Sequence, residues 1–381
     1  VAERCQMDEN AVYINCVHSH TAYRITAYGT EDIDDNDIFM MRLYQQFADC
    51  AQFAFEDLKP CTGMYYGSCN PEGLNFIRHY VLEDGTFKGD NFGDLNPSPY
   101  AGHTTEADNE MRLVKFHRVG APDVLLCNWQ THPHRTGGSR RYDVSADIVG
   151  VMRDEMEKAL GCKFIYFSGA GGNVNPSSRI AAENITKNYL EQGQAMARHA
   201  LDVEHRYEPL ELSNVKILTE KVWEDLNKPD EKLLEGCYIV REHWQKTNDF
   251  ISSCKLAQPY GINSPYAAGA FIGRAENTTD TGYFYPFTAI SIGDMAFVSV
   301  PYEMFDTNGM YIKENSPKKM TIVAECANGG NGYFPSELAW ENHGYEVDTC
   351  NNGYDAVEMV GATPYDLVIL DEMMPGMTGL E

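Results

Sequence analysis

Lys163-Phe-Ile-Tyr-Phe167 runs directly into Ser168-Gly-Ala-Gly-Gly-Asn-Val-Asn-Pro176, so an apolar run of strand length ends in a glycine-rich turn. Residues 123–129 form an earlier apolar run of similar length. Between the two runs, residues 144–160 carry their apolar side chains on one helical face, and Gly161 follows as a helix-ending residue. This order predicts a strand, a helix packed on a sheet, and a second strand.

The other segments mix strands and helices without a regular βαβ alternation. Strand patterns occur over residues 12–17, 111–116 and 320–324, in a hairpin over 287–300, and as short strands among the long loops of 63–109. Helical spacing occurs over 37–58 and 181–203, and residues 212–258 combine one strand with following helices. We therefore predict an α/β fold: a mixed sheet with helices packed on its faces, and a catalytic site at the C-terminal ends of strands.

The composition narrows the classes of partner. The chain has 381 residues and a formal net charge of -26, a field that repels nucleic-acid phosphates. The longest apolar runs, such as residues 366–370, are too short to cross a membrane.

The eleven cysteines are odd in number and contain no CxxC pair, which favours a reducing compartment over a disulfide framework, although one disulfide remains an alternative. The preference for a reducing compartment leads us to expect a cytoplasmic protein, and the lack of a signal peptide adds little to this, because the chain starts at Val1 without Met.

Two histidine pairs suggest a metal site. His18 and His20 are separated by one residue at the end of a predicted strand, so alternation would put both rings on one face. His132 follows the strand over residues 123–129, and His134 could substitute for it. The alternative interpretation of His18 and His20 is a pair of polar residues at a strand end.

Two further polar residues follow predicted strands. Glu303 comes after the strand that ends at Val300, and Tyr333 follows the glycine-rich loop after residues 322–324. Two or more histidines with one carboxylate are typical of a catalytic zinc site that keeps a position open for water.

The glycine-rich turn over residues 168–176 admits two interpretations. It lacks the Lys-Ser/Thr ending of a phosphate-binding P-loop, and its spacing is not GxGxxG. It is either a tight turn or a set of backbone N–H groups that face an oxyanion or a substrate oxygen.

Five sequence blocks in this order resemble the neutral/alkaline non-lysosomal ceramidases and their bacterial relatives. The blocks are Val17-His-Ser-His-Thr21, Asn128-Trp-Gln-Thr-His-Pro133, Gly169-Ala-Gly-Gly-Asn-Val-Asn-Pro176, Ile292-Gly-Asp-Met-Ala296 with Val300-Pro-Tyr-Glu303, and Asn328-Gly-Gly-Asn-Gly-Tyr-Phe-Pro335 with Gly344-Tyr-Glu346. The resemblance implies a Zn²⁺ cofactor held by four ligands: His18, His132, Glu303 and Tyr333.

The resemblance also implies a mechanism. Zinc would activate a water molecule that attacks the amide carbonyl of a small-molecule or lipid-like N-acyl substrate. His20 would carry the proton, and Tyr345 would stabilise the developing negative oxygen. The expected substrate-binding residues are Asn96, Gly171, Gly172 and Asn173.

The chain departs from the ceramidases at two positions. Pro97 stands where they have an arginine that helps to hold substrate, and Asn175, expected to be catalytic, stands where they have an essential serine. These departures point to a substrate other than ceramide. They also motivate an alternative, a zinc-binding scaffold without catalysis.

A second resemblance begins near residue 344. Tyr365-Asp-Leu-Val-Ile-Leu-Asp371-Glu-Met-Met-Pro-Gly resembles the middle of a response-regulator receiver domain, with Asp371 as the phospho-acceptor. The receiver's first strand with its acidic pair is not found, so Mg²⁺ would have few ligands. We predict a ceramidase-like domain over residues 1–346 and a partial receiver segment over 347–381, joined as a chimera. A two-component signalling fragment phosphorylated at Asp371 is the remaining alternative.

Overall fold

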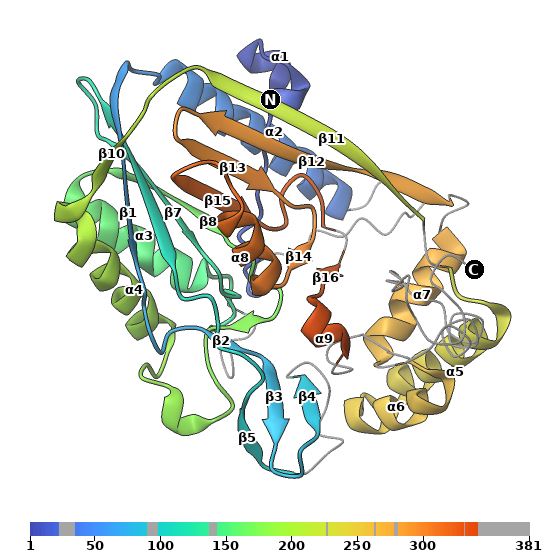
Figure 1. Cartoon of the computed structure of the whole chain (residues 1–381). Helices are drawn as coiled ribbons and strands as arrows, with labels where there is room; N and C mark the ends of the chain where they lie inside the picture. The colour runs from blue at the N-terminus through green and yellow to red at the C-terminus, as the bar shows by residue number, and fades with distance from the viewer. Residues whose placement is uncertain are drawn as a thin grey trace. The chain divides into compact units, whose positions relative to one another are not determined.

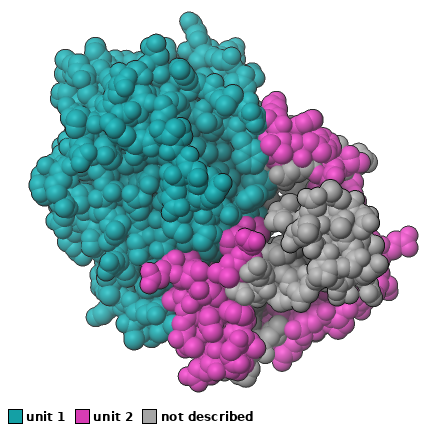
Figure 2. All heavy atoms as spheres, viewed as in Figure 1, with its two compact units in different colours: residues 1–76, 107–220, 286–334 teal, residues 77–106, 221–285, 335–381 magenta. Residues whose placement is uncertain are grey.

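The chain divides into two compact units, each built from segments that are distant in the sequence (Figure 2). The computed structural model describes residues 1–22, 35–89, 98–136, 143–225, 228–262, 264–277, 281–330 and 332–341. Unit 1 consists of Val1–Phe76, Ala107–Glu220 and Pro286–Phe334, and unit 2 of Ile77–Glu106, Lys221–Tyr285 and Pro335–Glu381. The predicted boundary between residues 346 and 347 lies outside the described residues.

Unit 1 contains a mixed five-stranded sheet in the order β10-β1-β6-β7-β8 (Figure 1). Its strands are β1 (Cys61–Cys69), β6 (Met111–Arg118), β7 (Val124–Trp129), β8 (Lys163–Ser168) and β10 (Glu208–Leu210). Neighbouring strands are antiparallel except for β7 and β8, which run parallel. The mixed α/β architecture predicted from the sequence is therefore confirmed.

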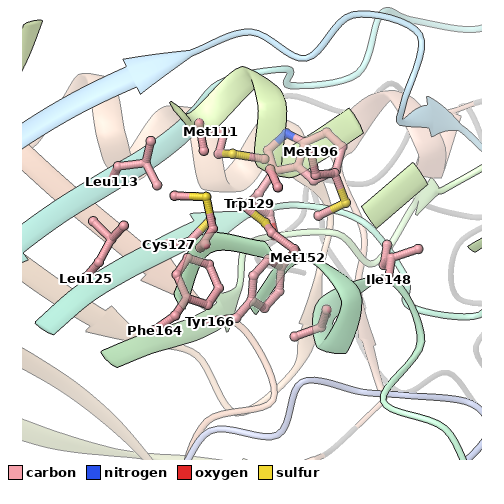
Figure 3. Close-up of a cluster of buried hydrophobic side chains, with 14 of the residues drawn as sticks. Met111, Leu113, Leu125, Cys127, Trp129, Ile148, Met152, Phe164, Tyr166 and Met196 are labelled. Atoms are coloured by element: carbon pink, nitrogen blue, oxygen red, sulfur yellow. The ribbon is translucent and has the colours of Figure 1, made fainter. Parts of the chain in front are cut away.

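Helices α3 (Asp147–Leu160) and α4 (Tyr189–Val203) contribute side chains to the core on one face of this sheet. Leu125, Cys127 and Trp129 of β7 contact that core, which Figure 3 shows together with Met152 of α3 and Met196 of α4. Burying a side chain of this size contributes about 1.5–3 kcal/mol. α3 ends where predicted, because Gly161 adopts the left-handed conformation that stops a helix.

A second sheet, rather than helices, packs on the opposite face. It has the order β11-β12-β13-β15, with bounds Val215–Asp225, Gly282–Ile292, Met295–Ser299 and Met320–Ala324. Leu126 of β7 and Val114 of β6 share a core with Met295, Phe297 and Ile322. β7 is thus buried on both faces, and the expectation of helices on both faces is wrong for this one.

The remaining elements are the long helix α2 of unit 1, several short segments, and the elements of unit 2. The helices are α1 (Ala2–Cys5), α2 (Asp35–Glu56), α5 (Glu231–Thr247), α6 (Phe250–Ala257), α7 (Pro265–Asn277), α8 (Asp306–Glu314) and α9 (Glu337–Glu341). The strands are β2 (Phe76–Ile77), β3 (His79–Leu82), β4 (Phe87–Gly89), β5 (Tyr100–His103), β9 (Val174–Asn175), β14 (Glu303–Met304) and β16 (Tyr333–Phe334). Unit 2 has its own core, to which α5, α6 and α7 contribute.

Within the described ranges, no helix is both long and apolar enough to cross a membrane. The ten cysteines in these ranges are free thiols.

Two predicted elements differ from the structure. Residues 12–17 are not a buried strand: only Asn15 forms a bridge, with Ala327, while Ile14 and Cys16 are exposed. The helix predicted from residue 181 begins at Tyr189, where the side chain of Asn188 accepts the N–H of Glu191 and caps it. Apolar spacing alone did not reveal this start.

Candidate metal centre

His132 is held by the glycine-rich turn of residues 168–176, which follows β8. It comes shortly after β7, which ends at Trp129, and it is buried. Its backbone N–H donates to the carbonyl oxygen of Val174 at 3.0 Å, and its ring Nδ1 lies 3.0 Å from the same oxygen. A carbonyl oxygen only accepts, so Nδ1 carries the proton, and in the neutral ring Nε2 keeps its lone pair.

Glu303 lies between His132 and His18. Its Oε2 is 3.1 Å from Nε2 of His132 and 3.4 Å from Nε2 of His18. His18 has a left-handed backbone, with φ of 61°, and therefore does not follow the strand alternation that the HxH spacing suggested. The ring centroids of His18 and His20 nevertheless lie 4.8 Å apart. The two side chains are therefore neighbours, although the backbone between them is not an extended strand.

The three converging atoms fit a bound cation. In the neutral tautomer, Nε2 of His132 has no proton to offer Glu303, so two electron-pair donors face each other at 3.1 Å; in the protonated ring, Nε2 donates to the carboxylate instead. A positive charge between them relieves this repulsion. Zinc–ligand bonds of about 2.0–2.2 Å in a tetrahedron put neighbouring ligand atoms about 3.3 Å apart, which matches the separations of 3.1 and 3.4 Å.

His20 and His134 extend the group to four imidazoles. The ring of His20 lies 5.5 Å from that of His132 and 5.3 Å from that of His134. His18, His20 and His132 each offer a ligand atom within 4.8 Å of the others, so these three can also hold a metal ion. Two ligand sets, one with Glu303 and one with His20, therefore overlap.

The electrostatic state of His20 follows from its neighbours. Although His20 is more exposed than His18 and His132, desolvation and then the neighbouring imidazoles of His132, His18 and His134 lower its pKa to about 3, against the raising effect of Glu303. His20 is therefore neutral at neutral pH and has a lone pair available.

Tyr333 lies beside Glu303 in the backbone ladder. β14 and β16 run parallel, and Glu303 and Tyr333 are directly paired in their register. Since directly paired residues project to the same face of a ladder, the tyrosine is placed beside the carboxylate. Its role as a ligand stays a prediction, and Asn96, Pro97, Tyr345 and Asp371 lie outside the described residues.

The glycine-rich turn uses its N–H groups within the protein. The N–H of Gly171 donates to Oε2 of Glu325 at 3.0 Å, that of Gly172 to the oxygen of Met304 at 2.8 Å, and that of Gly169 to the oxygen of Trp129 at 2.9 Å. The interpretation of these N–H groups as facing an oxyanion is therefore wrong for these three glycines. The turn is a packing device that holds the site together.

The two asparagines of the turn differ in their partners. The side-chain amide of Asn173 forms two hydrogen bonds with Asp306, the first residue of α8. Nδ2 of Asn173 donates to Oδ1 of Asp306 at 2.8 Å, and Oδ1 of Asn173 accepts the backbone N–H of Asp306 at 2.9 Å. Asn173 therefore anchors α8 in this structure, which argues against the substrate contact expected for it. Asn175 instead faces the imidazoles, since its Oδ1 lies 2.9 Å from Nε2 of His134.

Gly172→Ala should destabilise the protein strongly. A Cβ at this position would lie 2.3 Å from the carbonyl oxygen of Glu303 and 3.0 Å from that of Met304, so the strand that carries the carboxylate must shift. We expect a loss of about 3 kcal/mol in the free energy of unfolding, the upper end for overpacking, because the neighbour is backbone. Urea unfolding measures it. Gly330→Ala is the control, since its Cβ would meet nothing within 4 Å; equal stability of the two variants would contradict the packing role.

Four carboxylates in the described part of the chain are buried although none was predicted as a site residue: Asp108, Asp147, Asp306 and Glu325. Glu325 directly follows β15 and is 1% exposed. A polar residue at the end of an apolar strand is the same signal that pointed to Glu303, and it could have been used. Asp147, also 1% exposed, lies in a helix pattern that gave no such signal.

Solved ceramidase structures resemble this fold. Neutral ceramidase from Pseudomonas aeruginosa matches with a TM-score of 0.52 and 14% identity, over 80% of this chain and 52% of that chain. A ceramidase complexed with C2 matches with a TM-score of 0.51 and 14% identity, over 80% of this chain and 53% of that chain. The chain thus spans about half the length of these structures.

The C-terminal end resembles a different family. Residues 336–381 match the response regulator receiver domain, starting earlier than the segment predicted from the sequence. None of the curated proteins matches the chain significantly. The resemblances noted in the sequence are confirmed: the chain is similar in fold to neutral ceramidase over 80% of its length, and the sequence of residues 336–381 matches the family model of the receiver domain.

Proposed function

We propose that the protein is a zinc-dependent hydrolase that cleaves the amide bond of a small or lipid-like N-acyl substrate. The observation that carries the proposal is the approach of His18 Nε2 and His132 Nε2 to Oε2 of Glu303, at 3.4 and 3.1 Å, with the His132 tautomer set by Val174. The likeness in fold to ceramidases supports an amide as the bond that is cleaved.

Each residue has a role in the proposal. His18, His132, Glu303 and Tyr333 would hold the ion. When bound, zinc supplies Lewis-acid activation of water and polarises a carbonyl. His20 accepts a proton during attack and returns it to the leaving amine.

The remaining roles concern the substrate. Tyr345 donates a hydrogen bond to the developing negative oxygen, and Asn96 contacts the substrate. Asn175 holds Nε2 of His134 at 2.9 Å and so fixes the ring next to His20.

A substrate panel tests the proposal. The full chain is incubated with short-chain N-acyl amides, which need least from the arginine that Pro97 replaces, and released amine is measured. We expect hydrolysis that a chelator abolishes and added zinc restores. Zinc binding without turnover across the panel would instead support the scaffold alternative, which Pro97 and Asn175 motivate.

A second candidate function rests on the receiver match over residues 336–381. It would make Asp371 a phosphoryl acceptor. We expect no labelling by acetyl phosphate, because the acidic pair that holds Mg²⁺ in receiver domains is not found in the sequence before this segment. The comparison is radiolabel incorporation in the chain and in Asp371→Asn; labelling that disappears in the variant would establish the signalling function instead.

A further inference from the structure

Asp147, the first residue of α3, has an unusual backbone. It is 1% exposed and has a φ of 51°, a left-handed conformation that residues other than glycine seldom adopt. Such a conformation costs on the order of 1–3 kcal/mol and persists only where the surroundings enforce it. The interactions of Asp147 must therefore offset this cost.

The carboxylate of Asp147 binds the turn that carries the second histidine pair. Oδ1 accepts the N–H of Arg135 at 3.1 Å, and Oδ2 accepts the N–H of Thr136 at 2.5 Å. These two N–H groups directly follow His132-Pro-His134. Oδ1 also accepts the N–H of Ile148 at 2.7 Å, which fixes the carboxylate relative to the helix.

The residues just before Asp147 bind the segment that carries the first histidine pair. The carbonyl oxygen of Ser145 accepts Ser19 Oγ at 3.0 Å and Thr21 Oγ1 at 3.3 Å. The N–H of Ser145 donates to the oxygen of Thr21 at 3.0 Å, and its Oγ accepts the N–H of Asp147 at 3.0 Å. Ser19 lies between His18 and His20, so these bonds act on the first pair directly.

We propose that Asp147 is a positioning residue of the metal centre, which sets the two histidine pairs at their mutual distance. Residues 145–147 form a clamp: Ser145 bonds the His18–His20 segment, and Asp147 bonds the turn after His132–His134. The inference rests on the proposed function, since the pairs matter as a metal site. Asp147 acts through backbone N–H groups and contacts neither ion nor substrate.

Zinc affinity is the quantity that this clamp controls. Metal–ligand bonds tolerate changes of about 0.2 Å, so a turn that loses two backbone hydrogen bonds presents His132 less well. Outer partners of metal ligands typically change metal affinity by about 10–100-fold when they are removed.

The test compares variants of the full chain by zinc affinity, measured in competition with a chelator. Asp147→Gly removes the carboxylate but accepts a φ of 51° without strain, so it isolates the hydrogen bonds. We expect its zinc dissociation constant to rise about 10–100-fold. Met156→Ala, at a buried position later in the same helix, is the matched control for lost stability. It should lower the melting temperature and leave zinc affinity unchanged.

A second variant keeps the test decisive if Asp147→Gly fails to fold. Ser19→Ala with Thr21→Val removes the two hydroxyl bonds to Ser145 and should weaken zinc binding about 10-fold. The absorption spectrum of bound Co²⁺ should also change in either variant, which a loss of stability alone would not cause. Unchanged affinity and spectrum, with the wild type binding zinc, would overturn the clamp and leave the proposed function standing. A wild type that binds no zinc would overturn both.

Discussion

Glu303→Ala is expected to lose zinc almost completely, with an affinity more than about 100-fold weaker than that of the wild type, beyond the range for outer partners. The variant removes the carboxylate on which Nε2 of His132 and Nε2 of His18 converge at 3.1 and 3.4 Å. The imidazoles that remain are neutral ligands and supply no negative charge to balance a divalent ion. Zinc content after dialysis, measured by atomic emission, gives the result.

The control is a carboxylate removed elsewhere. Glu72 is exposed and belongs to the same unit, so Glu72→Ala should keep its zinc. Full zinc occupancy in Glu303→Ala would contradict its assignment as a ligand. It would favour the overlapping set of His18, His20 and His132 instead.

His20→Ala is expected to keep zinc and lose turnover by about 10²–10⁴-fold, the usual contribution of a general acid–base group. His20 lies beside the converging atoms, with its ring 4.8 Å from that of His18, but it belongs to the proposed site as a proton carrier. The turnover number on an accepted N-acyl amide, together with zinc content, checks both parts of the prediction.

His205→Ala is the matched control, since His205 is exposed in a 3₁₀ turn that follows α4. It should affect neither quantity. Wild-type turnover in His20→Ala would remove the proton-carrying role, and loss of zinc would make His20 a ligand. The second outcome has a physical basis. With a pKa of about 3, the ring of His20 is neutral in the metal-free protein, so its lone pair can bind a metal ion, whereas so weak a base takes up a proton poorly.

Elements with strong local patterns were predictable. β7, α3, β8 and the stop at Gly161 lie close to the residues predicted for them, because alternation, helical spacing and a left-handed glycine are local signals. The hairpin of β12 and β13 was found for the same reason: an apolar run interrupted by Gly293-Asp294 has few other solutions.

Elements that depend on partners distant in the sequence were not predictable. Residues 12–17 have the composition of a strand, but the β-pairing of this segment is limited to the single bridge between Asn15 and Ala327. The second face of the central sheet is covered by β13 and β15, and local periodicity cannot tell a covering sheet from covering helices. Tertiary context decided both.

The site shows the same division. His18, His132 and Glu303 were selected by type and position, and the structure brings them within hydrogen-bonding or ion-pair distance. The supporting groups were hidden, because Asp147 acts through backbone N–H groups whose positions the sequence does not reveal. The contact between Asn173 and Asp306 was hidden for a similar reason, since the two residues are far apart in the chain.

Zinc content of the purified full chain, with His18→Ala beside it, tests the central claim most directly. The proposed site predicts about one equivalent of tightly bound zinc in the wild type and a clear loss in the variant, as expected for a single ion held by this ligand set. Less than about half an equivalent in the wild type, unchanged in His18→Ala, would contradict the metal site and the hydrolase built on it.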